Sequence, residues 1–172
     1  TVLEGKVPYA KALAFAEMRD DHNDKMSKTK KNYIPYDDAA DKAGSDLIRF
    51  NFCLSPFGKN IMFGWRTMDE LKRQFLLPLW NSYVYFGTYA KMCNWEPKEN
   101  FIPTDVMDKW ALASLQNLVN EVTKSMDEYK FYQAANLIQE FVVELSTWFI
   151  RRSRDRFKNG DTDAVQTLYM SL

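Results

Sequence analysis

Glycine, proline, histidine and cysteine are all scarce in this sequence. Six glycines and six prolines among 172 residues fall below the roughly 12% that the two together usually contribute, which favours long helices over a turn-rich β fold. One histidine, His22, and two isolated cysteines, Cys53 and Cys93, provide no zinc-ligand spacing. We therefore expect no metal site, two free thiols, and His22 at the surface.

The sequence also lacks net charge and long apolar runs. The 23 basic residues balance 23 acidic ones, so no overall positive field attracts a polyanion, and DNA is not an expected partner. Neither a run of about 18 apolar residues nor a signal-peptide pattern is present, so we expect a soluble, cytoplasmic protein with no membrane partner. The start at Thr1 suggests a piece of a larger protein.

Hydrophobic periodicity predicts helices over most of the chain after residue 35. The first 35 residues show no sustained period and are expected to form a strand, a turn and an exposed loop, and residues 58–64 a connector. Three long amphipathic helices with short connections should pack as an antiparallel bundle. The expected helices are 36–43, 45–54, 67–90, 105–129, 131–157 and 162–172.

Local signals place several helix ends. Thr67, with Glu70 three residues later, predicts a capping box at the start of the first long helix. Pro78 is expected to bend that helix. Thr104 or Asp105 suits the N-cap of the next one.

A lysine-rich stretch occupies the polar loop before residue 35. It reads Lys25-Met26-Ser27-Lys28-Thr29 and continues as Lys30-Lys31-Asn32. A run of this kind also occurs as an ordinary solvated turn, so the motif alone leaves both interpretations open. It closely resembles the KMSKS signature of class I aminoacyl-tRNA synthetases.

The surrounding sequence is similar to the isoleucine members of that family over nearly the whole chain. The resemblance implies a mainly α fold in two parts. Residues 1–60 would be the C-terminal part of a Rossmann-type α/β catalytic domain, and 61–172 an anticodon-binding antiparallel helix bundle. The similar stretches are 3–9 (LEGKVPY), 41–50 (DKAGSDLIRF), 76–83 (LLPLWNSY), 86–90 (FGTYA) and 138–157 (IQEFVVELSTWFIRRSRDRF).

The resemblance also implies the chemistry of the loop. In the family, the signature lysines bind the triphosphate of ATP, which carries Mg²⁺, while the amino acid attacks the α-phosphorus and pyrophosphate leaves. Carried over by position, Lys25 and Lys28 are the catalytic residues, because ammonium groups there stabilise the charge that develops on pyrophosphate. The implied ATP-binding residues are Lys25, Met26, Ser27, Lys28 and Thr29.

The loop departs from the family pattern at two positions. Thr29 replaces the usual final serine and keeps the hydroxyl group. Lys31 stands where glycine commonly precedes Asn32. Because glycine reaches positive φ without strain, we expect a stiffer loop here, or a further phosphate contact from Lys31.

A cluster of cations lies near the end of the expected helix 131–157. In the alternative interpretation the cluster is a salt-bridged helix terminus, in which Asp155 pairs with Arg151 or Arg152. The resemblance instead implies contacts to tRNA phosphates that weaken as salt rises. The implied tRNA-binding residues are Arg151, Arg152, Arg154, Arg156 and Lys158.

Aromatic residues flank this cluster. Trp148, Phe149 and Phe157 suit stacking on unpaired anticodon bases. Their helical spacing favours the core instead, and Trp110 and Trp148 are expected to be core residues.

Several parts of such an enzyme are missing from the chain. With one histidine, it cannot contain the family's histidine-bearing ATP signature, and the editing insertion is also absent. We therefore expect the chain alone to bind no cofactor and to be inactive, whereas the full-length ligase would use ATP, isoleucine and its tRNA. The alternatives are a sister synthetase for valine, leucine or methionine, a non-catalytic tRNA-binding module, and a purely structural bundle.

Overall fold

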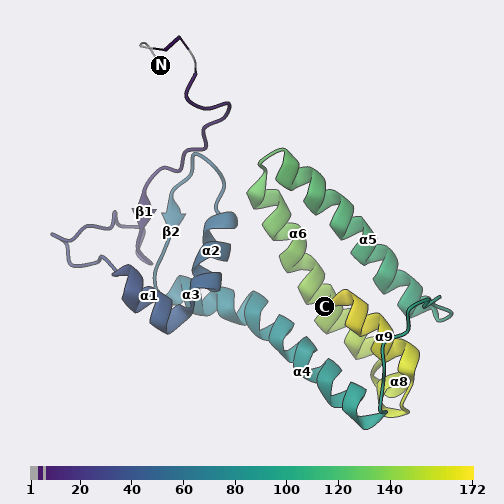
Figure 1. Cartoon of the computed structure of the whole chain (residues 1–172). Helices are drawn as coiled ribbons and strands as arrows, with labels where there is room; N and C mark the ends of the chain where they lie inside the picture. Colours follow the sequence, from purple (N-terminus) through teal and green to yellow (C-terminus); the bar gives the residue numbers. More distant parts are fainter. Residues whose placement is uncertain (1–3, 6) are drawn as a thin grey trace.

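The structure, a computed structural model, describes residues 4–5 and 7–172. Leu3 and Lys6 of the similar stretch 3–9 lie outside the described residues. Figure 1 shows a small unit around β1, β2, α1 and α2, and a larger helical unit around α5, α6, α8 and α9. The elements are β1 (Met18–Arg19), α1 (Tyr36–Ala43), α2 (Ser45–Cys53), β2 (Ile61–Met62), α3 (Trp65–Leu71), η1 (Lys72–Leu76), α4 (Leu77–Met92), α5 (Val106–Asp127), α6 (Phe131–Glu144), η2 (Leu145–Phe149), α7 (Ile150–Arg152), α8 (Arg154–Lys158) and α9 (Thr162–Ser171).

The small unit is a two-stranded parallel sheet with helices packed beside it. Met18 pairs with Ile61, so the expected connector 58–64 contains a strand and that prediction is wrong. The core of this unit includes Ala39, Leu47 and Met68. It continues past residue 60, so the position of the domain boundary stays a prediction.

Helix α3 begins differently from the predicted capping box. Asp21, in the loop after β1, accepts hydrogen bonds from the N–H groups of Arg66 at 2.9 Å and Thr67 at 3.0 Å, and from the Thr67 hydroxyl at 2.7 Å. Glu70 instead pairs with Arg66 at 3.8 Å. The capping-box prediction is wrong because a distant carboxylate satisfies the free N–H groups of the first turn.

The first long helix is continuous from α3 to α4, with a π-helical turn in between. That turn, η1, ends at Leu76, just before Pro78. Proline has no N–H to donate and its ring crowds the carbonyl group four residues earlier. A wider turn relieves this crowding, so the irregularity expected at Pro78 lies immediately before it.

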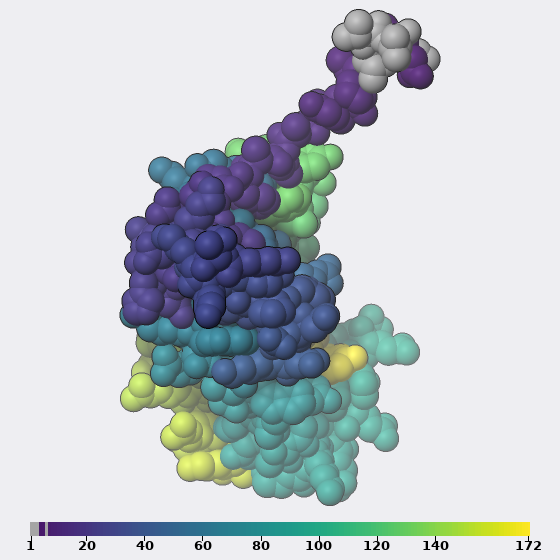
Figure 2. Space-filling view, turned by 90° about the vertical axis from the view of Figure 1, so that its left-hand side faces the viewer, coloured from purple at the N-terminus to yellow at the C-terminus, as the bar shows by residue number. Residues whose placement is uncertain are grey.

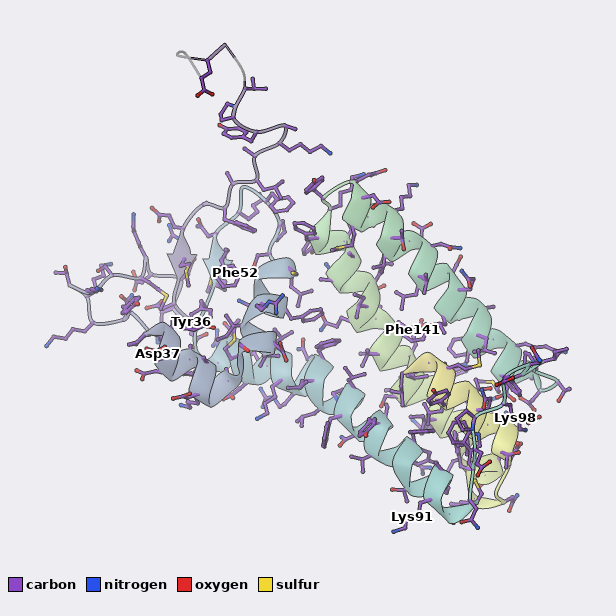
Figure 3. The ribbon with its side chains drawn as sticks, in the orientation of Figure 1. Tyr36, Asp37, Phe52, Lys91, Lys98 and Phe141 are labelled. Atoms are coloured by element: carbon purple, nitrogen blue, oxygen red, sulfur yellow. The ribbon has the colours of Figure 1, made fainter. Side chains whose placement is uncertain are left out.

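The helical unit is an antiparallel arrangement, as predicted. Helices α5 and α6 lie side by side, and α9 packs against α5 and α4 (Figure 1). Asp105 caps α5 by accepting a 2.7 Å hydrogen bond from the N–H of Met107. The connection before α5 is fixed by Lys98, whose N–H donates to Gln166 on α9 at 2.9 Å (Figure 3).

The core of this unit consists of side chains from α5 through α9. The buried core residues are Ala111, Leu145, Phe149, Ile150, Phe157, Ala164, Val165 and Leu168.

The N-terminal segment, purple in Figure 2, extends from the body of the molecule. No helix among the described residues has the length and apolar character needed to cross a bilayer.

Candidate functional site

The lysine loop, residues 20–32, projects from the edge of the small unit (Figures 1 and 2). Its base is fixed by a bridge between Arg19 and Lys25 and by the N–H of Met26, which donates to the carbonyl of Met18 at 3.1 Å. Met26 packs against the core of the small unit. Lys25, Lys28 and Thr29 are exposed, so these three signature side chains face solvent.

Two polar side chains keep the loop closed. Asn32 accepts from the N–H of Ser27 at 2.9 Å and donates to Asp20 at 2.8 Å. Asp20 also accepts from the N–H groups of His22 and Asp24. The Asn32 hydrogen bond, followed by the Asp24 N–H, lowers the pKa of Asp20. Sequence reasoning missed Asp20, although aspartate is a common turn-forming residue.

The two signature lysines differ in their surroundings. Lys25 donates to Glu17 at 2.7 Å, and this hydrogen bond is the main reason that the pKa of Glu17 is lowered. The Lys28 ammonium lies 5.7 Å from the centre of the Tyr33 ring and forms no ion pair with any described residue. Lys28 is therefore free to meet an anion, whereas Lys25 must first release Glu17.

Lys31 occupies the left-handed region of backbone space. Its φ is +55°, and its N–H donates to the carbonyl of Lys28 at 3.2 Å. Lysine thus adopts the conformation that glycine takes more easily. The effect of this lysine on loop stiffness stays a prediction.

The cationic cluster lies on α7 and α8. Arg151, Arg152, Arg154 and Lys158 are exposed. Within the described part of the chain, Asp155 makes no ion pair with Arg151 or Arg152. The structure therefore gives no support to the salt-bridged terminus, and four side chains can present charge to a ligand.

Arg156 faces inward instead. It binds Asp108 at 2.9 and 2.6 Å, Asp161 at 2.8 Å and Asp105 at 3.0 Å. Burial acts to lower the pKa of Arg156, but the hydrogen bonds to Asp108 and Asp161 outweigh it and raise the pKa. Because its donors are engaged, Arg156 joins α5, α8 and the start of α9. We therefore separate it from the other four cations.

The aromatic residues near the cationic cluster also include both buried and exposed side chains. Phe149 and Phe157 are fully buried, as their spacing predicted, whereas Trp148 is 48% exposed and is not a core residue. Trp110 is partly buried against the core. The Arg152 guanidinium lies 5.1 Å from the Trp148 ring centre, so an exposed aromatic surface adjoins the cationic cluster.

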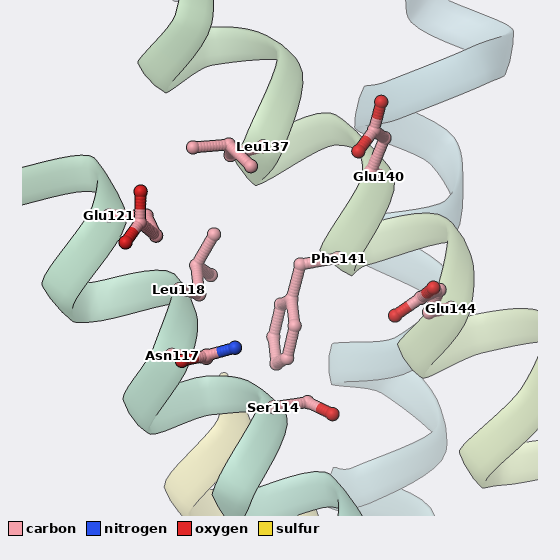
Figure 4. Close-up of a pocket in the computed structure, with 8 residues that line it drawn as sticks. All are labelled: Ser114, Asn117, Leu118, Glu121, Leu137, Glu140, Phe141 and Glu144. Carbon is pink, nitrogen blue, oxygen red and sulfur yellow. The ribbon is translucent and has the colours of Figure 1, made fainter. Parts of the chain in front are cut away.

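A groove between α5 and α6 has the opposite charge. Its cavity of about 200 Å³ is lined by carboxylates of Glu121, Glu140 and Glu144 together with Phe141 (Figure 4). These charges repel phosphate, so the groove does not suit RNA or ATP.

No metal site is formed by the described residues. They contain no group of three or more His, Cys, Asp or Glu side chains that could hold a metal ion.

Two stretches of the chain match families of tRNA ligases. Residues 1–64 match the family described as tRNA synthetases class I (I, L, M and V). Residues 108–172 match the anticodon-binding domain of tRNA ligase. Together with the fold, these matches identify the chain as a class I tRNA synthetase segment, with the end of a catalytic domain and part of an anticodon-binding domain.

The chain is homologous to isoleucine–tRNA ligases along its whole length. It is 38% identical to the enzyme of Dehalococcoides mccartyi (strain CBDB1) over 180 residues, which is 100% of the chain and 18% of the relative. The corresponding values are 37% over 96% of the chain and 17% of the relative for Clostridium tetani. The chain is 38% identical to the enzyme of Protochlamydia amoebophila over 86% of the chain and 15% of the relative. The chain thus spans less than a fifth of these relatives.

Proposed function

We propose that this chain is the part of an isoleucine–tRNA ligase that links ATP chemistry to tRNA binding. In the whole ligase, isoleucine and ATP form isoleucyl-adenylate with loss of pyrophosphate, and the isoleucyl group then passes to a hydroxyl group of its tRNA with release of AMP. The observation that carries this proposal is the exposed ammonium of Lys28, which pairs with no acid among the described residues, in a loop braced by Asp20 and Asn32. A braced loop places charge without a large entropy cost on binding.

The loop acts through its two lysines. Lys28 meets the β- and γ-phosphates directly, and Lys25 exchanges the carboxylate of Glu17 for a phosphate oxygen. Both ammonium groups stabilise the negative charge that moves onto pyrophosphate. The hydroxyl of Ser27 accepts from the N–H of Lys30 at 3.1 Å, so its role is to shape the loop. Mg²⁺ arrives bound to the phosphates of ATP.

The helical unit binds tRNA through four exposed cations and one aromatic ring. Arg151, Arg152, Arg154 and Lys158 contact backbone phosphates. Trp148 stacks on an unpaired base, and the guanidinium of Arg152 beside it adds a cation–π contribution. Arg156 is left out because its guanidinium is bound to Asp108 and Asp161.

Isoleucine is the favoured amino acid because the relatives above are named isoleucine–tRNA ligases. A sister enzyme for valine, leucine or methionine shares the loop and the bundle. Charging assays with each amino acid on the full-length ligase distinguish them. A non-catalytic tRNA-binding module predicts binding without any charging.

A salt titration of tRNA binding to the 172-residue chain tests the RNA part of the proposal. Each phosphate contact contributes about 0.7 to 0.9 to the slope of log K against log salt. Replacing both Arg151 and Arg154 by alanine should therefore reduce the slope by about 1.5. Lys124→Ala, which removes an exposed cation at the far end of α5, should leave the slope unchanged. Equal slopes for all three proteins contradict the assignment.

A further inference from the structure

Asp21 attaches the lysine loop to the first turn of α3. Its carboxylate accepts from the N–H groups of Arg66 and Thr67 and from the Thr67 hydroxyl, at 2.7 to 3.0 Å. Its backbone carbonyl accepts from the Arg66 guanidinium at 3.3 Å. Side chain and main chain of one loop residue are thus both fixed by the start of a helix.

Gly64 makes this close approach possible. A Cβ atom at this position would lie 2.3 Å from the Cγ of Asp21, which is far inside van der Waals contact. The backbone of Gly64 is extended, with φ of −173°, so glycine is needed for space and not for an unusual conformation. Any side chain at position 64 would push the Asp21 carboxylate off the helix.

On its other side, Asp21 lies within the closed turn that precedes Lys25. The N–H of Asp20 donates to the carbonyl of Asp24, and the N–H of Asn23 donates back to the carbonyl of Asp20, both at 2.9 Å. Lys25 follows this turn directly and is bridged to Arg19. A shift of the α3 terminus against β1 therefore moves the turn and the lysine next to it.

Helix α3 also connects to the helical unit. It continues through η1 into α4, and Phe86 and Tyr89 of α4 pack against the core formed by α5 to α9. Figure 1 shows α3 and α4 as one continuous helical path between the two units, and this path carries Thr67, which Asp21 contacts, as well as Phe86. The path thus joins the turn before Lys25 to the RNA-binding unit.

We propose that Asp21 is a positioning residue for adenylate formation. With Gly64, it locks the lysine loop onto the helix that enters the bundle and so fixes where Lys25 and Lys28 meet ATP. The role of the lysines rests on the proposed function, whereas the mechanical link does not. Asp21 itself touches no substrate.

Amide hydrogen exchange on the 172-residue chain tests the link. Asp21→Asn weakens the contact from one side and Gly64→Ala from the other. Both should speed exchange at Arg66 and Thr67 and also at Ser27 and Lys31 in the loop, by about fivefold, the effect of losing a helix cap. The double variant should exceed the larger single effect only slightly, because both changes remove the same contact.

Two matched controls belong to this experiment. Asp24→Asn alters a loop acid whose side chain pairs, among the described residues, only with Lys30, at 3.6 Å, and Gly87→Ala adds a Cβ that meets nothing within 4 Å. Both should leave exchange at Ser27 and Lys31 unchanged. If Asp21→Asn and Gly64→Ala speed exchange only in α3, Asp21 is a helix cap alone and the positioning role is overturned.

Pyrophosphate exchange by the full-length ligase provides the catalytic readout. Asp21→Asn and Gly64→Ala should each lower kcat by roughly 10- to 100-fold, as small misplacements of catalytic groups do, with KM for isoleucine unchanged. If Lys28→Ala lowers the rate but Asp21→Asn and Gly64→Ala do not, the positioning role of Asp21 is overturned and the proposed function stands. If Lys28→Ala leaves the rate unchanged, the proposed function is overturned. Amide hydrogen exchange then still tests the mechanical link between Asp21 and α3.

Discussion

Asp20 and Asp21 are adjacent in the chain, yet their carboxylates organise different structures. Asp20 accepts from Asn32 at 2.8 Å and closes the lysine loop, whereas Asp21 accepts from Thr67 at 2.7 Å and starts α3. One peptide unit thus separates the brace of the loop from the cap of the helix.

The stability that Asp21 provides should depend on pH. Burial acts to raise its pKa, but the hydrogen bonds from Thr67 and Arg66 outweigh burial and lower the pKa below the ordinary 3.8. Since the folded-state pKa is the lower one, the contribution is complete above the unfolded value and is lost as pH falls through the folded one. Urea unfolding should find Asp21→Asn less stable at pH 7, with the gap closing as the pH falls through the lowered pKa of folded Asp21. A gap that stays constant over this range contradicts the assignment.

Arg156→Ala should destabilise the helical unit strongly. The change leaves Asp108, whose exposure is 0%, without its charged partner. Removing one member of a buried pair costs about 3 kcal/mol or more. Lys158→Ala, an exposed cation on the same helix, should change the free energy of unfolding by less than about 0.5 kcal/mol. Similar losses for the two variants would mean that Arg156 has no special structural role.

Lys31→Gly should stabilise the chain slightly. A residue other than glycine in the left-handed region, here at φ of +55°, costs about 1 kcal/mol. The greater freedom of glycine in the unfolded chain offsets part of this gain. Lys30 does not have positive φ, so Lys30→Gly should lower stability by about 0.5 kcal/mol. Thermal unfolding of both variants measures these changes in stability. If Lys31→Gly and Lys30→Gly lose the same amount of stability, the backbone at Lys31 is not strained.

Trp148→Ala and Phe149→Ala should separate RNA binding from folding. Trp148 is 48% exposed, so its loss should weaken tRNA binding by about 1–3 kcal/mol, as expected for a base-stacking ring, with little change in stability. Phe149 is fully buried, and its removal should cost about 3–5 kcal/mol of stability. Fluorescence anisotropy with tRNA and urea unfolding measure the two effects. Unchanged affinity of Trp148→Ala would remove it from the interface.

Local sequence predicted most helices because their ends carry their own signals. Asp105 caps α5 from within the same turn, so the sequence alone indicates that start. The start of α3 could not be found in this way, since its capping carboxylate, Asp21, lies 46 residues before Thr67. A contact of this kind depends on the pairing of β1 with β2, which no local pattern reveals.

In the candidate site too, local sequence predicted some features and missed those that depend on contacts between distant residues. The motif placed Lys25 and Lys28 in an exposed loop, and the structure has them there. The expectation that Trp148 lies in the core is wrong, because the π-helical turn η2 buries Leu145 and Phe149 and leaves Trp148 exposed. Nor could the inward orientation of Arg156 be foreseen, since its partner Asp108 lies on another helix.

In the proposed reaction, Lys28 stabilises the departing pyrophosphate. Pyrophosphate exchange by the full-length ligase, comparing Lys28→Ala with Lys30→Ala, measures this most directly. Lys30 is a neighbouring lysine that already pairs with Asp24 at 3.6 Å. We expect Lys28→Ala to lower kcat with little change in KM, because the contact forms in the transition state, and Lys30→Ala to retain the full rate. Equal rates for Lys28→Ala and the unchanged ligase would contradict the account.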